Sequence, residues 1–350
     1  MASKDAEKVI VLRNVKKVYR MGTERIVAVD DVSFEILKGE FCCLLGTSGS
    51  GKSTLLNLMA GIEKVTSGQI IIKGKKIHKM NETSLAKFRQ KYLGFVFQSY
   101  NLMNSMTALE NVEFPLVFKR VKPKVRKKLA KDMLIQVGLG SRLGHKPKEM
   151  SGGQQQRVGI ARAFVAKPEI VFADEPTGNL DTKTTMEVMN LIQAIARENR
   201  QTIVMVTHDP RLASYADRII HVLDGDIEKI EVQYDITDPE VYRRRVEEAR
   251  AAAPKLTESS PPADKARSKK AGRTKRKERP KQEAAGTGEE KKAADASIAR
   301  VEEKVMEVID RLDTQETPDK ELTEGLKESV QAMDSGHSDA EYQESRGNEV

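Results

Sequence analysis

The chain has 350 residues, of which 32% are charged, and its mean hydropathy is -0.52. Its length is enough for two domains, but so polar a composition indicates that part of it does not join a packed core. No run of about eighteen apolar residues exists, which excludes a membrane-spanning helix, and the charged first residues are not followed by the apolar segment of a secretory signal. We therefore expect a cytoplasmic protein.

Short apolar runs rich in β-branched residues alternate with helical stretches up to about Asp235. The runs expected to form strands include residues 41–45, 94–97, 170–173 and 203–207. Such alternation is typical of an α/β fold with a largely parallel sheet. Beyond it, Asp238 followed by Pro239 resembles a helix N-cap with proline at the first helical position, which predicts a helix to about Ala253.

The rest of the chain is divided by charge. Residues 264–281 hold ten Lys or Arg against two acids, and residues 301–350 hold five basic against fifteen acidic residues. Heptad-like spacing relates five apolar residues of this region: Ile298, Val301, Val305, Val308 and Leu312. These suffice for one short amphipathic helix but are too few for a stable coiled coil. The expected organisation is a folded domain (1–237), a C-terminal helix (238–254), a basic disordered linker (255–297), a short amphipathic helix (298–313) and an acidic disordered tail (314–350).

A phosphate-binding loop is predicted at Gly46–Ser53, where the sequence GTSGSGKS follows an apolar run. Its glycines let the backbone curl around a polyphosphate, and its amides and the following helix N-terminus supply positive potential. Lys52 is expected to bridge the β- and γ-phosphates, Ser53 to ligate Mg²⁺, and Thr54 to contact the α-phosphate. The predicted ATP ligands here are Gly46, Thr47, Ser48, Gly49, Ser50, Gly51, Lys52, Ser53 and Thr54.

Two adjacent carboxylates follow the apolar run 170–173. At the carboxyl end of a strand, Asp174 can hold Mg²⁺ through water, and Glu175 can act as the general base that polarises an attacking water. These residue types in this order predict ATP hydrolysis assisted by Mg²⁺.

The run Met150–Arg157, MSGGQQQR, resembles the signature motif of ABC-type ATPases. Other motif residues of that family also appear in order. Tyr19 resembles the aromatic residue that stacks on adenine, and Gln98 resembles the Q-loop glutamine. Asp181 resembles the D-loop aspartate, and His208 resembles the switch histidine. The resemblance covers about residues 8–235. It implies a P-loop fold with a mixed core sheet and flanking helices, an antiparallel β subdomain and an α-helical signature subdomain.

The same resemblance implies a mechanism. ABC-type ATPases bind two ATP molecules between two head-to-tail subunits, so that the signature residues of one subunit complete the γ-phosphate cage of the other. The residues implied in this role are Ser151, Gly152, Gly153 and Gln154, at the start of a helix expected over 154–166. His208 would hold the attacking water and Glu175 in geometry. Glu175, His208, Lys52 and Gln98 are the implied catalytic residues, and Ser53, Gln98 and Asp174 the implied metal ligands.

A narrower resemblance comes from the stretch Phe88–Leu116 and from EPTGNLD at Glu175–Asp181. Both look like the ATPases of lipoprotein release, macrolide export, antimicrobial-peptide resistance and the related cell-division complex. This implies a homodimer peripheral to the inner face of the cell membrane, driving a separate integral membrane permease. The chain departs from the pattern at Val65, where proline is usual, at Met150, where leucine is common, and beyond Ala253.

The segment after Gln98 is expected to form the groove that receives a permease helix. It carries adaptable apolar side chains in what would otherwise be a polar loop: Tyr100, Leu102, Met103 and Met106. The alternative is that these side chains pack only internally.

The alternative function is a soluble ABC ATPase that acts on a nucleic-acid or assembly partner through its basic tail. Translation-linked members usually carry two ATPase modules and chromosome-linked members insert a long coiled coil, whereas about fifty residues separate Gln98 from Ser151 here. Nucleic acid is therefore not the expected partner. The basic residues between Lys269 and Lys281 are instead expected to reach an anionic membrane surface, which is compatible with the transport role.

Overall fold

The computed structural model describes residues 7–22 and 24–254. The expectations for the linker, the amphipathic helix and the acidic tail therefore lie outside the described residues. The strands are β1 (Lys8–Met21), β2 (Glu24–Leu37), β3 (Phe41–Leu45), β4 (Ser67–Ile72), β5 (Lys75–Lys76), β6 (Leu93–Phe97), β7 (Ile170–Asp174), β8 (Thr202–Thr207), β9 (Arg218–Leu223) and β10 (Asp226–Val232). The α-helices are α1 (Lys52–Met59), α2 (Glu82–Tyr92), α3 (Ala108–Phe118), α4 (Pro123–Gln136), α5 (Gly152–Phe164), α6 (Thr182–Glu198), α7 (Pro210–Ala213) and α8 (Pro239–Ala252). Short 3-10 turns occupy Ile77–Lys79, Gly140–Arg142 and Pro147–Glu149.

The larger sheet has six strands in the order β10-β9-β3-β8-β7-β6. Every neighbouring pair is parallel except β9 and β10, which are antiparallel. All six residues of β8 are buried, and β3 and β7 are buried over their first four residues. Continuous apolar runs are expected where helices cover both faces of a parallel sheet. The mixed core sheet predicted from the sequence is confirmed.

The functional motifs follow the carboxyl ends of four neighbouring strands. In the parallel register Leu45 of β3 pairs with Thr207 of β8, and Asp174 of β7 pairs with both Val206 of β8 and Phe97 of β6. The loops that begin after these strands therefore leave the sheet at the same edge. In open α/β sheets this edge is where ligands bind.

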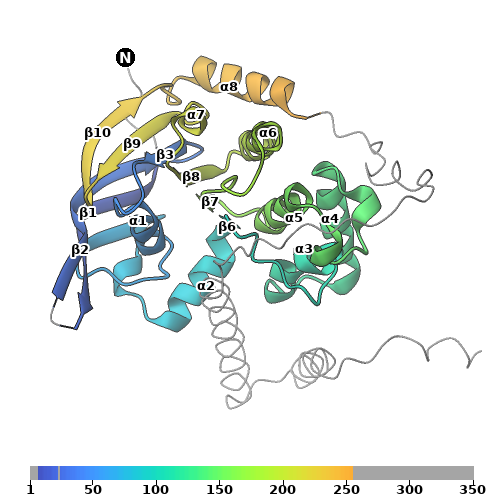
Figure 1. The fold of residues 1–350 in the computed structure, drawn as a ribbon, viewed down its shortest axis with the longest axis horizontal. Helices are drawn as coiled ribbons and strands as arrows, with labels where there is room; N and C mark the ends of the chain where they lie inside the picture. The colour runs from blue at the N-terminus through green and yellow to red at the C-terminus, as the bar shows by residue number, and fades with distance from the viewer. Residues whose placement is uncertain (1–6, 23, 255–350) are drawn as a thin grey trace, which may run out of the picture. The chain divides into compact units, whose positions relative to one another are not determined.

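A second, antiparallel sheet has the order β2-β1-β4-β5. Its inward side chains form a common core with α1 and one face of the larger sheet, including Ile10, Ile36, Leu58 and Ile72. Figure 1 shows β1 and β2 beside α1, on the opposite side of the larger sheet from α3, α4 and α5. This arrangement confirms the antiparallel β subdomain and sets Tyr19 of β1 near the helix that follows the phosphate-binding loop.

Helices α3, α4 and α5 pack together into a helical subdomain (Figure 1). Its centre is made of fully buried aliphatic residues such as Val112, Leu134 and Val158. Helix α5 begins at Gly152, two residues before the start expected from the sequence, and ends at Phe164. The reason is that Ser151 caps the helix, so the glycines that follow already lie in its first turn.

Helix α8 begins as the sequence predicts. The Asp238 side chain accepts a hydrogen bond from the Glu240 amide at 2.8 Å, and Pro239 occupies the first turn. Arg245 anchors the helix, because its guanidinium donates to the Tyr215 carbonyl at 2.9 Å and lies 4.0 Å from the centre of the Tyr234 ring. Helix α8 also packs against α6.

Candidate active site

Lys52 lies in the first turn of α1 and is almost completely buried, with 5% of its surface exposed. Its ammonium donates to the Thr47 carbonyl at 2.5 Å and lies 3.3 Å from the Ser50 hydroxyl. Burial lowers the pKa of Lys52, while the nearby Glu175 and Asp174 carboxylates oppose that shift. The loop therefore holds a cation against its own backbone at the edge of the sheet, where an anionic phosphate would gain most from it.

Two glycines of the loop are required by close backbone contacts. A Cβ atom at Gly46 would lie 2.2 Å from the Val222 carbonyl oxygen, and one at Gly51 would lie 2.2 Å from that of Ala28. Gly51 also has a φ of 95°, in the left-handed region. These contacts pack the loop against β9, through Val222, and against β2, through Ala28. The conformation of the loop is therefore set by packing within the protein.

Ser53 and Asp174 meet across the site. The Ser53 hydroxyl donates to the Asp174 carboxylate at 3.3 Å. Burial raises the pKa of Asp174, and the Ser53 hydrogen bond and the Lys52 charge act against that rise. A hydroxyl and a carboxylate are oxygen ligands suited to Mg²⁺, which keeps waters and binds substrate phosphates as well. Among residues 7–22 and 24–254, no group of three or more His, Cys, Asp or Glu side chains is placed to hold a metal ion.

Glu175 and His208 form a hydrogen-bonded pair. The two side chains are 2.8 Å apart between His208 Nδ1 and Glu175 Oε1, and His208 remains 61% exposed. Glu175 has a φ of 41°, and its amide donates to the Val206 carbonyl at 3.0 Å. A non-glycine residue in the left-handed region costs on the order of 1 to 3 kcal/mol, and such strain clusters at functional sites. The hydrogen bond to Val206 of β8 thus helps to hold the Glu175 backbone in a conformation that it rarely adopts alone.

Gln98 follows β6 directly and is exposed. Its side chain lies against Gly178, where an added Cβ would be 2.6 Å from the glutamine Nε2. The Asn179 amide group donates to the Gln98 carbonyl at 3.1 Å. These contacts place Gln98 beside the turn that follows Glu175, at the same sheet edge as the phosphate-binding loop.

The signature residues open α5 with a capping box. The Ser151 amide donates to the Gln154 side chain at 3.0 Å, and the Gln154 amide donates to the Ser151 hydroxyl at 3.4 Å. Side chains at the two glycines would clash, because a Cβ at Gly152 would lie 2.8 Å from the Tyr100 hydroxyl and one at Gly153 would lie 2.7 Å from Thr184. The first turn of α5 therefore carries no side chain at these two positions, a local structure that suits an anion.

Asp181 caps α6 beside this group. Its carboxylate accepts from the Thr184 amide at 3.0 Å and from the Thr184 hydroxyl at 2.6 Å. Those hydrogen bonds lower the pKa of Asp181. Among the described residues, no hydrogen bond joins Ser151 or Asp181 to the phosphate-binding loop of the same chain. The structure therefore does not bring the signature group and the loop into direct contact within one subunit.

Tyr19 lies at the border of the β subdomain and α1. Its hydroxyl donates to the Glu63 carboxylate at 2.5 Å, and the Lys17 ammonium lies 4.8 Å from the centre of its ring. Burial and the Glu63 hydrogen bond raise the pKa of Tyr19, and a hydrogen bond with Thr54 opposes the rise. The contact with Thr54 puts the aromatic residue next to the phosphate-binding loop.

Two further residues link the parts of the site and were missed in the sequence. Gln156 is fully buried, and its amide group donates to the Pro176 carbonyl at 2.5 Å and to the Phe97 carbonyl at 3.3 Å. Arg162, further along α5, donates to the Tyr100 carbonyl at 2.9 Å and to the Asn101 carbonyl. Burial lowers the pKa of Arg162 to about 10. Gln156 is part of the signature motif, which is the signal that could have identified it. No sequence signal marks Arg162.

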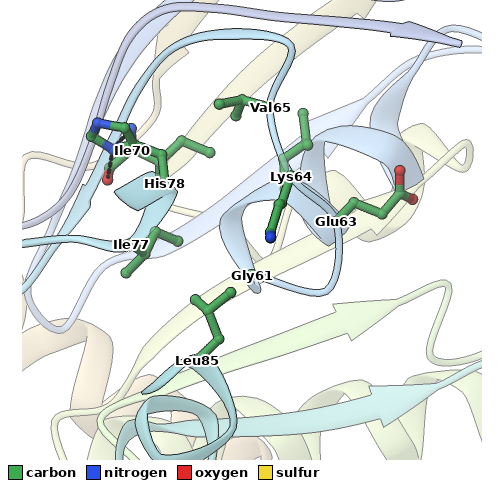
Figure 2. Close-up of a pocket in the computed structure, with 9 residues that line it drawn as sticks. Gly61, Glu63, Lys64, Val65, Ile70, Ile77, His78 and Leu85 are labelled. Carbon is green, nitrogen blue, oxygen red and sulfur yellow. Dashed lines mark hydrogen bonds between the residues drawn. The ribbon is translucent and has the colours of Figure 1, made fainter. Parts of the chain in front are cut away.

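A small cavity lies away from this edge, between the end of α1 and α2 (Figure 2). Gly61, Ile77, His78 and Leu85 are among the residues that line it, and its volume is about 10 Å³. His78 Nδ1 is hydrogen-bonded to the Ile70 carbonyl oxygen, at a distance of 3.0 Å. A volume of this order holds about one water molecule, so the cavity is no candidate for a nucleotide.

Comparison with known proteins agrees with this geometry. The family model described as "ABC transporter" matches residues 29–178. An uncharacterised ABC transporter ATP-binding protein of Thermotoga maritima is 46% identical over 225 residues, which cover 64% of this chain and 96% of that relative. A macrolide export ATP-binding/permease protein of Bartonella quintana is 42% identical over 227 residues, 65% of this chain but only 34% of the relative.

Solved structures give the same result. The dimeric post-hydrolysis structure of an ATP-binding cassette of Methanocaldococcus jannaschii, bound to ADP and Pi, matches with a TM-score of 0.61 and 43% identity over 65% of this chain and 99% of that one. Because these relatives are transporter cassettes, the alternative of a nucleic-acid-associated ATPase is not favoured. Within the part of the chain that the structure describes, no helix is long and apolar enough to cross a membrane. The fold, the motifs at one sheet edge and the similarity along the cassette show that this chain belongs to the family of ABC transporter ATP-binding proteins, the ATP-hydrolysing ABC ATPases.

Proposed function

We propose that this chain is the ATPase subunit of a transport or mechanotransmission complex, in which two copies close on two ATP molecules and drive a separate membrane permease. The proposed ATP hydrolysis is supported by the 2.8 Å hydrogen bond between His208 and Glu175, near the buried Lys52. A carboxylate held by a histidine can orient and deprotonate a water for attack on the γ-phosphate.

The roles of the other residues follow from their positions. Lys52 would bind the β- and γ-phosphates, Ser53 and Asp174 would hold Mg²⁺ with Gln98 at the neighbouring strand end, and Tyr19 would support the adenine ring. Bound there, Mg²⁺ would supply positive charge next to the phosphates. The amides of residues 46–54 provide the remaining contacts to the nucleotide.

The signature group acts on the second copy. Ser151, Gly152, Gly153 and Gln154 present a hydroxyl and helix amides that, among the described residues, hydrogen-bond no group of their own phosphate-binding loop. An anion site of this kind is satisfied when a partner supplies the γ-phosphate. The dimeric state of the related cassette with ADP and Pi supports this assignment, and Asp181, at the start of α6 beside the signature, belongs to the same face.

The permease is proposed to contact the segment after Gln98. Tyr100, Leu102, Met103 and Met106 are each half-buried, which leaves apolar surface for a partner. Asn111 organises this segment, because its side chain accepts from the Met103 amide at 2.8 Å and donates to the Met103 carbonyl at 3.1 Å. The macrolide-export relative is an ATP-binding/permease protein, which supports a permease as the partner of this ATPase.

The experiment is affinity purification of the full chain from detergent-solubilised membranes, followed by ATPase assay and identification of bound proteins. We expect an integral membrane protein in stoichiometric amount and Mg²⁺-dependent hydrolysis that is lost on chelation with EDTA. A chain that hydrolyses ATP but retains no membrane protein under any solubilisation condition would contradict the permease part of the proposal.

A further inference from the structure

One segment of the described part of the chain is strongly positive. Residues 119–148 hold eleven Lys or Arg and one acid, a net charge of +10, whereas residues 1–254 as a whole carry +11. This segment runs from the end of α3 through α4 to the turn before the signature. The other residues up to 254 sum to about +1, although residues 52–91 also hold nine Lys or Arg against two acids. The segment 119–148 is therefore the more basic of two positive stretches.

Helix α4 arranges four of these charges as a stripe. Lys124, Lys127, Lys128 and Lys131 follow the i, i+3, i+4, i+7 spacing that places residues on one helix face, and all four are exposed. Within the described ranges none of the four forms a salt bridge, whereas Arg126 pairs with Glu113 at 3.2 Å. The packed side of the helix adjoins the stripe, where Ala130 and Leu134 are fully buried.

Exposed aliphatic residues lie next to the lysines on the same helix. Val125 is 48% exposed, Ile135 46% and Leu129 37%. Apolar side chains beside a row of lysines are the features with which a helix lies in the headgroup layer of a membrane, because the aliphatic groups enter the interface while the ammonium groups stay at the phosphates. The stripe contains no arginine for bidentate contacts and no aromatic residue on which a base could stack.

We propose that the α4 stripe, defined as Lys124, Lys127, Lys128 and Lys131 with the neighbouring Val125 and Leu129, docks on the anionic surface of a lipid bilayer. The proposal rests on the proposed function, because attachment to a permease would hold the cassette within reach of the bilayer. Figure 1 shows α4 grouped with α3 and α5, away from the antiparallel sheet of β1 and β2. Contact through α4 would therefore set the orientation of the helical subdomain while leaving the β subdomain uninvolved.

The test is co-sedimentation of the full chain with phosphatidylcholine vesicles that contain either no anionic lipid or about 30% phosphatidylglycerol. The variant replaces all four lysines of the stripe by Gln, which keeps helix propensity. Its matched control replaces four exposed lysines of the β subdomain and α2 by Gln and so changes the net charge equally: Lys75, Lys76, Lys79 and Lys87. Both variants retain the basic residues 264–281, so a difference between them cannot come from that segment.

One lysine near an anionic membrane contributes about 1 kcal/mol, or roughly a fivefold change in affinity. We expect the α4 variant to bind anionic vesicles at least about 30-fold more weakly, the control to stay within about threefold, and the difference to shrink at high salt. Val125→Ser with Leu129→Ser should weaken the binding that remains at high salt. Equal losses in the two lysine variants, or equal binding to neutral vesicles, would overturn the proposal.

Two further readouts separate this proposal from others. Binding to a labelled DNA duplex is measured for the same variants, and a loss confined to DNA would make the occupant a nucleic acid and refute docking on lipid. Permease co-purification and ATPase rate in detergent should be unchanged in the α4 variant. If no permease is found while the α4 variant still loses vesicle binding, the proposed function fails and the surface assignment stands. If a permease is found but the α4 variant binds anionic vesicles as well as the parent does, only the surface assignment is refuted.

Discussion

The Arg162 guanidinium donates to the Tyr100 carbonyl at 2.9 Å and thereby ties the signature helix to the segment that follows Gln98. Tyr100 and Asn101 are consecutive non-glycine residues in the left-handed region, with φ of 62° and 47°. The Tyr100 hydroxyl also lies close to Gly152, where an added Cβ atom would be only 2.8 Å from it. Helix α5 and the segment after Gln98 are thus linked through Tyr100 near both ends of the helix.

Replacing Arg162 by Gln should lower the free energy of unfolding by about 2 kcal/mol. The reason is that two backbone carbonyls lose charged donors while the left-handed pair stays strained. Asn101→Gly removes part of that strain, so the loss caused by Arg162→Gln should be smaller in the Asn101→Gly background. Urea unfolding of the four proteins measures this. Identical losses in the two backgrounds would show that Arg162 acts only as a packed core residue.

Ser151→Arg should abolish hydrolysis without preventing nucleotide binding. The long cation would block the signature helix N-terminus, whereas the phosphate-binding loop of the same subunit has no hydrogen bond to Ser151. Fluorescent ATP binding and steady-state hydrolysis are measured together, with Lys52→Ala as the variant that loses binding itself. Normal hydrolysis by Ser151→Arg would refute the composite site, as would a loss of binding as complete as that of Lys52→Ala.

Changing Tyr100, Leu102 and Met106 together to Ser should weaken association with the permease. These half-buried side chains supply apolar contact area, and none of them bears on the Glu175–His208 pair directly. Basal ATPase activity of the isolated chain should therefore stay within about threefold of the parent, while pull-down of the permease falls by tenfold or more. If the variant is insoluble, the single Met106→Ser change provides the comparison. Unchanged pull-down together with lost stability would favour internal packing.

Much of this site could be predicted from the sequence because local chemistry fixes it. The phosphate-binding loop, the two carboxylates after β7 and the histidine after β8 lie in contiguous motifs, and parallel register brings them to one edge. Gln156 and Arg162 could not be assigned, since their hydrogen bonds join segments about sixty residues apart. The start of α5 was misjudged for a different reason: its glycines have low helix propensity, and the Ser151 cap and tertiary contacts override it.

Stopping the chain after Ala253 should leave the ATPase rate and the thermal midpoint nearly unchanged. Helix α8 ends at Ala252, its anchor Arg245 is retained, and every residue proposed for catalysis precedes it. A further stop before Asp238 serves as the control that removes the Arg245 anchor and should lower the midpoint by several degrees. Loss of hydrolysis in the first truncation would mean that residues beyond 253 belong to the working enzyme.

Glu175 is proposed to activate the attacking water at an ATP site shared by two copies. Glu175→Gln removes the base but keeps the side-chain volume and the phosphate contacts, so ATP should still bind and hold a dimer. We predict that hydrolysis falls at least about 100-fold and that size-exclusion chromatography with ATP shows a dimer that the parent does not accumulate. Glu198→Gln, an exposed change at the end of α6, is the control and should behave as the parent does. Near-normal hydrolysis by Glu175→Gln, with no ATP-dependent dimer, would refute both the role of Glu175 as the base and the shared ATP site.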